Sequence, residues 1–417
     1  MVRLIIIALG IIFLDTITPW GLKRTFPHFS PRHMRRIRII FTAHAIVSVT
    51  TILFGFIIQR HITDYRYLPW LYYFWGLIGA MYIPKSFYAS LLIVDWCLSR
   101  ISKMYRRQFD RFPRGSRCIL AKYGFFTSAA LIVLIAWSIF WGRDNIKVDQ
   151  VEIYVDHLPR AFNGYKIALI SDVHAGSFLN AAERFQKAVD MINEQEPNLI
   201  VCTGDIVNNF AGELVSLIPV FSQLKAPNGK YAVLGNHDYG GYSDWDNPTD
   251  SIINHQLIKD GIEQMGFTLL NNQSTIISRY NSDHIALIGI ENWGVKKRHP
   301  KRGNIELAMK QVQNIPFKIL LLHDPSYWRM EVKDKIDVTL SLSGHTHGTQ
   351  VGMKIGQKYV TLAPFFGLPY GTGLYQTDKQ YLYVNRGLGV IGFPGRFGMP
   401  PEITVITLWK EKAPEQL

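Results

Sequence analysis

The stretch SGHTHGTQ, residues 343–350, places His345 and His347 two positions apart between glycines. Neutral imidazoles are common ligands of transition metals, although two histidines in a turn can also be no more than solvated polar residues. Asp172 and His174 have the same spacing. Because residues i and i+2 of extended backbone face the same side, each pair can hold one metal ion from one short segment. These four residues predict a metal site that further ligands must complete.

Further candidate ligands stand at the ends of short apolar runs that resemble buried β-strands. Core packing accounts for the apolar part of each run, but it gives no reason for Asp, Asn or His to follow directly. In open α/β sheets, ligands bind beyond the carboxyl ends of the strands, so we expect these side chains to meet at one edge. The full set is Asp172, His174, Asp205, Asn236, His237, His323, His345 and His347.

The elements that carry these residues form the second part of the chain. From about residue 146 onward, short apolar runs alternate with polar, helix-like segments, which is typical of an α/β domain. Residues 151–155 and 165–174 are predicted as consecutive strands, and residues 180–197 as a helix with Asn180 at its start. We therefore predict an α/β domain over residues 146–417.

The first part of the chain, residues 1–145, has the composition of a membrane anchor. Up to Arg143 it contains nineteen Lys and Arg against four acidic residues, a formal charge of +15, which leaves −2 for the remainder. This basic charge lies between apolar runs, which is the pattern of membrane topology. We therefore expect a membrane as partner and no nucleic acid, despite the net charge of +13. The three cysteines are far apart and predict no disulfide framework.

Four apolar runs are candidate membrane spans. The runs at 39–58 and 124–142 match the roughly 20 residues that a spanning helix needs. The run at 4–14 is either a signal peptide or an uncleaved span, and the lack of a small-residue cleavage site after it favours the span. The stretch 67–98 is too long for one straight crossing and contains Pro84, so it forms either one kinked helix or a broken pair.

The basic loops predict the orientation. Residues 21–38 hold six Lys or Arg and residues 98–123 hold eight, whereas residues 59–67 hold only two. Loops rich in Lys and Arg stay on the cytoplasmic side. Both basic loops are cytoplasmic if the stretch 67–98 crosses once, and they fall on opposite sides if it crosses twice. We therefore predict an all-α region of about four transmembrane helices in a bacterial inner or plasma membrane, followed by an extracytoplasmic domain.

Five motifs in a fixed order make a family visible. They are D-x-H at Asp172, G-D-x-x-N from Gly204, G-N-H-D from Gly235, a single histidine at His323 and G-H-x-H from Gly344. This order resembles the calcineurin-like metallophosphoesterases, and the apolar runs and C-terminal tail resemble the membrane-anchored bacterial branch of YkuE- and YaeI-type phosphoesterases. The resemblance implies a four-layer αββα sandwich.

The resemblance also implies two divalent metal ions, with manganese favoured and iron or zinc as alternatives. A water shared by the two ions would lose a proton and attack phosphorus. His237 would act as general acid or charge stabiliser for the leaving oxygen, and Asp238 and Asn208 are candidates to orient an imidazole. The implied ligands are Asp172, His174 and His347 for one ion, Asn236, His323 and His345 for the other, and Asp205 as a catalytic bridge between them.

The expected activity is hydrolysis of phosphomono- or phosphodiesters, with lipid or cell-envelope phosphoesters as the substrate class. Phe365, Phe366, Leu368 and Tyr370 form either a packed loop or an apolar lip for an acyl chain. One alternative is the UDP-2,3-diacylglucosamine pyrophosphatase of lipid A synthesis, which conflicts with an extracytoplasmic domain. Another is a non-catalytic metal-binding membrane sensor or scaffold. A transporter is disfavoured because the charges expected within the spans form no evident relay.

Overall fold

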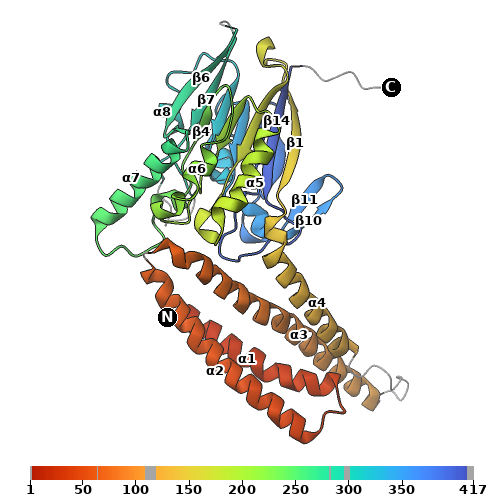
Figure 1. Cartoon of the computed structure of the whole chain (residues 1–417). Helices are drawn as coiled ribbons and strands as arrows, with labels where there is room; N and C mark the ends of the chain where they lie inside the picture. The colour runs from red at the N-terminus through yellow and green to blue at the C-terminus, as the bar shows by residue number, and fades with distance from the viewer. Residues whose placement is uncertain (1, 63, 109–118, 281–282, 295–300, 411–417) are drawn as a thin grey trace. The chain divides into compact units, whose positions relative to one another are not determined.

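The computed structural model describes residues 2–62, 64–108, 119–280, 283–294 and 301–410 (Figure 1). The chain divides into two compact units. The first, which we call the helical unit, consists of Met1–His61 and Tyr73–Ile139. The second, the α/β unit, consists of Ile62–Tyr72 and Phe140–Leu417. A short segment between two apolar helices is thus part of the α/β unit, although the predicted boundary near residue 146 left it with the helices.

The helical unit is built from helices that are long and apolar enough to cross a membrane. The long stretch that includes Pro84 forms one continuous helix and not a broken pair, as a single crossing requires. Its first residues, up to Tyr72, belong to the α/β unit. The helices are α1 (Val2–Thr25), α2 (Pro31–His61), α3 (Leu68–Gln108) and α4 (Ile119–Phe140), with a 3₁₀ turn at Tyr65–Tyr67 before α3.

Charged residues inside the helical unit are paired. The Asp15 carboxylate of α1 accepts hydrogen bonds from Lys85 Nζ at 2.6 Å and from the Tyr82 hydroxyl at 2.8 Å, and it lies 2.9 Å from His44 Nδ1. An unpaired charge is costly in an apolar medium, so such residues find partners on neighbouring helices. The helices thus bring together residues that are far apart in the sequence.

Two six-stranded sheets form the centre of the α/β unit. Their orders are β1-β14-β2-β3-β4-β5 and β12-β13-β9-β8-β7-β6, and β10 and β11 form a separate hairpin. Strands β2 to β5 are mutually parallel, as are β7, β8, β9 and β13. The first sheet contains β1 (Lys147–Tyr154), β2 (Tyr165–Ile170), β3 (Leu199–Cys202), β4 (Lys230–Ala232), β5 (Thr268–Leu269) and β14 (Glu402–Trp409). The others are β6 (Gln273–Arg279), β7 (Asp283–Gly289), β8 (Lys318–Leu321), β9 (Leu340–Ser343), β10 (Gly352–Ile355), β11 (Lys358–Thr361), β12 (Gly373–Gln376) and β13 (Tyr381–Val384).

Alternation of side chains along the strands creates the four layers. On β2, Ile167 and Leu169 point into the core between the sheets, whereas Ala168 and Ile170 face the helices on the other side. Helices α5 and α7 cover the first sheet and α8 covers the second (Figure 1). The helix bounds are α5 (Ala181–Asn193), α6 (Ile218–Phe221), α7 (Pro248–Gln264), α8 (Ile305–Met309) and α9 (Pro325–Tyr327). The predicted αββα sandwich is confirmed.

Candidate active site

The predicted ligands lie in the loops that follow the carboxyl ends of the central strands, and the structure gathers them into two groups. One group comes from the loops after β2 and β9, and the other from the loops after β3, β8 and β9. Within each group, the potential ligand atoms lie within 4.8 Å of one another. The groups are Asp172, His174 and His347, and Asp205, His323 and His345.

The Asp205 carboxylate lies between the two groups. Its Oδ2 is 3.1 Å from His323 Nε2 in its own group and 3.7 Å from His174 Nε2 in the other. Its Oδ1 accepts a hydrogen bond of 2.8 Å from the His237 backbone N–H, which fixes the plane of the carboxylate. Asp205 is only 2% exposed, so its negative charge has little contact with solvent and calls for nearby positive charge.

The ligand loops have a left-handed backbone. The φ angles are +47° at Asp172, +46° at His174, +53° at Asp205, +73° at His345 and +51° at His347. This conformation costs non-glycine residues about 1–2 kcal/mol each, and such residues gather at functional sites. The extended geometry assumed for the two i, i+2 pairs was therefore wrong. Asp172 and His174 still share a group, whereas His345 and His347 fall into different ones, as the family resemblance implied.

Asn236 offers a free oxygen to the site. Its Oδ1 is buried and has no hydrogen-bond partner among the residues that the structure describes, which is costly unless another group, such as a cation, approaches it. The amide nitrogen donates to the Tyr242 hydroxyl at 2.7 Å, which turns the oxygen the other way. Tyr242 also stacks on His237, with ring centres 4.1 Å apart. An oxygen ligand in this position fits a divalent cation.

The imidazoles are oriented as ligands of a cation. His323 Nδ1 donates to the Thr203 carbonyl oxygen at 2.7 Å, which turns Nε2 toward the Asp205 carboxylate, where it could bind a metal. That Nε2 lies 3.1 Å from His345 Nδ1, and His174 Nε2 and His347 Nε2 are equally close to each other. Two facing nitrogen lone pairs repel unless a proton or a cation lies between them. Burial lowers the pKa of His323, but the Asp205 carboxylate outweighs it and raises that pKa to about 10.

Asp238 and Asn208 support the loops in different ways. The Asp238 carboxylate accepts backbone N–H bonds from Gly235 and Asp205 at 2.8 Å each, and further ones from Ile206 and Val207, so within the described part of the chain it holds backbone and not an imidazole. Burial and the charge of Asp205 raise the pKa of Asp238 to about 7. The Asn208 amide lies 3.1 Å from His174 Nδ1, so it is in place to orient an imidazole.

His237 is held with one ring nitrogen free. Its Nδ1 donates to the Asn208 carbonyl oxygen at 2.7 Å, which leaves Nε2 as the atom that can meet a substrate oxygen. Burial lowers the pKa of His237 below its usual value, although the Asp205 carboxylate acts in the opposite direction. The free protein therefore favours the neutral imidazole.

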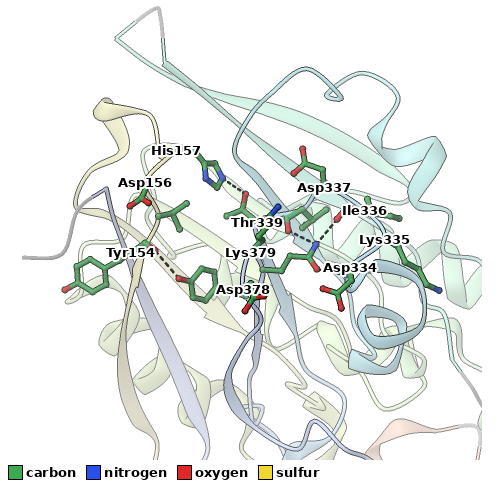
Figure 2. A pocket seen from close by; sticks show the side chains of 14 residues that line it. Tyr154, Asp156, His157, Asp334, Lys335, Ile336, Asp337, Thr339, Asp378 and Lys379 are labelled. Carbon is green, nitrogen blue, oxygen red and sulfur yellow. Dashed lines mark hydrogen bonds between the residues drawn. The ribbon is translucent and has the colours of Figure 1, made fainter.

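A cavity of about 860 Å³ lies at the other end of the strands (Figure 2). Two of its lining residues come directly before strands: Thr339 precedes β9 and Gln380 precedes β13. The candidate ligands, by contrast, follow the carboxyl ends of their strands. Asp378 and Lys379 are exposed at its rim. The predicted site residues are absent from its lining, so its volume gives no reason to place the chemistry there.

Several residues near the ligands escaped the sequence analysis. Asp324 lies 3.7 Å from His345 Nε2, and the buried Arg396 lies 3.3 Å from His347 Nδ1. The buried Glu213 carboxylate accepts backbone N–H bonds from Asn208 and Gly176 at 2.6 and 2.8 Å. These contacts bring distant segments together and have no local pattern, although Asp324 directly follows a motif histidine.

The proposed apolar lip is only partly present. Phe365 and Phe366 are 87% and 70% exposed. Tyr370, by contrast, packs against Trp328 and Tyr375 with ring centres 5.4 and 4.9 Å away, so it belongs to the packing of the second sheet.

Comparison with known proteins shows which family and which relatives this chain is similar to. Residues 165–349 match the family model described as calcineurin-like phosphoesterase. The uncharacterized metallophosphoesterase YkuE of Bacillus subtilis is 34% identical over 253 residues, which cover 60% of this chain and 81% of YkuE. A transmembrane protein with metallophosphoesterase domain from Danio rerio is 30% identical over 328 residues, covering 76% of this chain and 69% of the relative. A solved dimetal phosphatase from Danio rerio covers 54% of this chain and 88% of its own, with 12% identity and a TM-score of 0.32, a likeness too low to inform the chemistry.

Proposed function

Because the chain belongs to the calcineurin-like metallophosphoesterases, we propose that its α/β unit hydrolyses phosphomono- or phosphodiesters with two divalent metal ions. The reaction class, hydrolysis of phosphoric ester bonds, follows from the family. The observation that carries the two-ion proposal is the place of the Asp205 carboxylate, within 3.7 Å of an imidazole from each candidate group. One carboxylate between two cations lowers their mutual repulsion.

The two proposed metal ions correspond to the two groups of candidate ligands. The donor set contains carboxylate, amide and imidazole and no thiolate, which suits manganese, iron or zinc, and of these we propose manganese. When bound, two such ions lower the pKa of a water molecule and stabilise negative charge on phosphoryl oxygens. One ion would be held by Asp172, His174 and His347, the other by Asn236, His323 and His345, and Asp205 would serve both.

The remaining residues would act on the substrate or hold the ligands. His237 would present Nε2 to the leaving oxygen and donate a proton to it, because its Nδ1 is fixed on the Asn208 carbonyl. Tyr242 would hold the Asn236 oxygen toward the site and the His237 ring in place. Asp238 would keep the loops after β3 and β4 together through its backbone contacts.

We test this proposal with the full chain in detergent, assayed on bis-p-nitrophenyl phosphate with manganese, zinc, iron and magnesium. We expect turnover that a chelator abolishes and manganese restores, and an inactive His345→Ala variant. His284→Ala is the matched control, since His284 lies on β7 away from the ligand groups. A wild-type protein that binds less than one ion per chain and hydrolyses nothing would instead favour the non-catalytic sensor or scaffold.

We further propose that the α/β unit is extracytoplasmic in a bacterial inner or plasma membrane. Support comes from α3, a single helix, which with α4 gives two crossings between Tyr72 and Phe140. The basic residues at 21–38 then lie on the cytoplasmic side. A reporter enzyme that is active only outside the cytoplasm can be fused after Gly142. We expect this fusion to be active. A cytoplasmic signal would overturn this placement and remove the objection to the UDP-2,3-diacylglucosamine pyrophosphatase alternative.

A further inference from the structure

The β10–β11 hairpin turns its apolar face to solvent. Met353 and Val360 are directly paired across the hairpin and are 58% and 51% exposed, and Ile355 on the same face is 58% exposed. Lys358, the partner of Ile355 at the tip of the hairpin, adds one exposed charge to this face. On the opposite face, the Tyr359 ring packs 3.9 Å from the Arg386 guanidinium. Antiparallel strands normally bury the apolar face and expose the polar one. This hairpin instead leaves apolar side chains exposed on one face, while its other face carries the exposed Lys354 beside the packed Tyr359.

The exposed apolar surface continues beyond the hairpin. Leu362 is 42% exposed, and the 3₁₀ turn Ala363–Phe366 anchors itself with the buried Ala363 while both of its phenylalanines point outward. Large exposed apolar side chains gathered in one segment mark a surface that another apolar phase covers. We call this surface the apolar patch; it consists of Met353, Ile355, Val360, Leu362, Phe365 and Phe366.

The apolar patch is joined to the candidate metal loops. The hairpin starts at Gly352, directly after the loop that contains His347. The Leu362 backbone N–H donates to the Thr349 hydroxyl at 3.2 Å, which ties the far end of the hairpin to the same loop. The patch therefore borders the edge of the α/β unit at which the ligands lie.

Two segments of the α/β unit that continue along the chain into the apolar helices lie at this edge. Arg386, beneath the hairpin, donates to Asp149 at 2.7 Å near the start of β1, and β1 follows shortly after the end of α4. Figure 1 shows the hairpin beside the start of β1. In the other segment, the Tyr72 hydroxyl and the Asn208 amide are hydrogen-bonded at 3.2 Å.

We propose that this edge of the α/β unit rests on the bilayer that its helices span, with the apolar patch inserted among the acyl chains, and that the substrate is a phosphoester of a membrane lipid. The lipid headgroup would reach the ligand loops while its acyl chains stay in the membrane. Exposed Phe140 and Trp141, at 60% and 64%, mark the chain's exit from α4 with the aromatic residues typical of a membrane interface. This inference rests on the proposed phosphoesterase function.

Insertion is tested with tryptophan in place of Phe365. The full chain is reconstituted in phosphatidylcholine vesicles whose acyl chains carry bromine, which quenches nearby indole fluorescence. Phe365→Trp should add fluorescence that bromine quenches, whereas Leu307→Trp, at a position 57% exposed on α8, should add fluorescence that it does not. Equal quenching of the two added tryptophans, or no quenching of the one at position 365, would contradict insertion of the apolar patch into the bilayer.

Substrate class is tested in the same vesicles with phosphatidic acid as a monoester and phosphatidylglycerol as a diester. We expect the wild type to hydrolyse one of these lipids. A Phe365→Ser, Phe366→Ser double variant should hydrolyse that lipid about 10- to 100-fold more slowly and bis-p-nitrophenyl phosphate at the wild-type rate. The control variant Leu307→Ser should hydrolyse both substrates at the wild-type rate. Hydrolysis of the soluble ester but of neither lipid overturns the lipid substrate and leaves the phosphoesterase function standing. If the wild-type protein does not hydrolyse bis-p-nitrophenyl phosphate either, the proposed phosphoesterase function itself is contradicted.

Discussion

Replacement of Asp205 by asparagine is expected to reduce the rate of phosphodiester hydrolysis by about 10³-fold or more, since bound divalent ions contribute several kcal/mol to such reactions. Asparagine keeps the shape of the side chain and one oxygen that can accept the His237 backbone N–H, so the loop should remain folded. The substitution removes the negative charge between the two candidate groups and replaces one of the two carboxylate oxygens by an NH2 group, which cannot bind a metal. The measurement is kcat at saturating manganese.

Asp378→Asn is the matched control for this substitution. Asp378 is an exposed carboxylate that lines the cavity at the opposite end of the strands. The variant should retain the wild-type rate. A large loss in Asp378→Asn together with a mild effect of Asp205→Asn would place the chemistry in that cavity and contradict the site described above.

His237→Ala is expected to cost about 10²- to 10⁴-fold on a phosphodiester with an alkyl leaving group, the usual contribution of a general acid. The loss should be small on a p-nitrophenyl ester, whose leaving group needs no proton. The His237 backbone N–H that binds Asp205 is unaffected by the substitution, so metal content should not change. Equal losses on both esters would show that His237 has another role.

The pH dependence of the same reaction has a definite sign. The acid form of His237 is the one required, and burial lowers its pKa below the usual 6.5. For the alkyl ester, kcat/KM should therefore fall as pH rises through that lowered pKa, and the ratio of wild-type to His237→Ala rates should be largest at the acid end. An alkyl-ester rate that instead increases with pH equally in both proteins would contradict proton donation by His237.

Local sequence patterns were sufficient for the strands and most of the candidate site. The apolar run before Asp172 became β2, and the segment with Asn180 at its start became α5. The motif order, and not the i, i+2 spacing, predicted how the candidate ligands divide between the two groups. Extended geometry would have given His345 and His347 to one centre, whereas their left-handed backbone sends them to different groups.

What the sequence could not supply depends on long-range contact. Strand β14 lies between β1 and β2 in the sheet, although β14 is the last strand in chain order and β1 and β2 are the first two. Tyr72 joins the α/β unit from the start of a helix that is otherwise apolar and membrane-like. The outward apolar face of the β10–β11 hairpin was also unpredictable, because the alternation of Met353 and Ile355 with lysine is equally compatible with a buried face.

The central claim is that two metal ions bind to two distinct groups that share Asp205. It is tested most directly by the metal content of the purified full chain, measured by mass spectrometry after loading with manganese and removal of free ions. We expect two ions per chain in the wild type, and about one in His174→Ala and in His345→Ala, which remove a ligand from different groups. A single ion in the wild type, lost completely in either variant, would contradict the account.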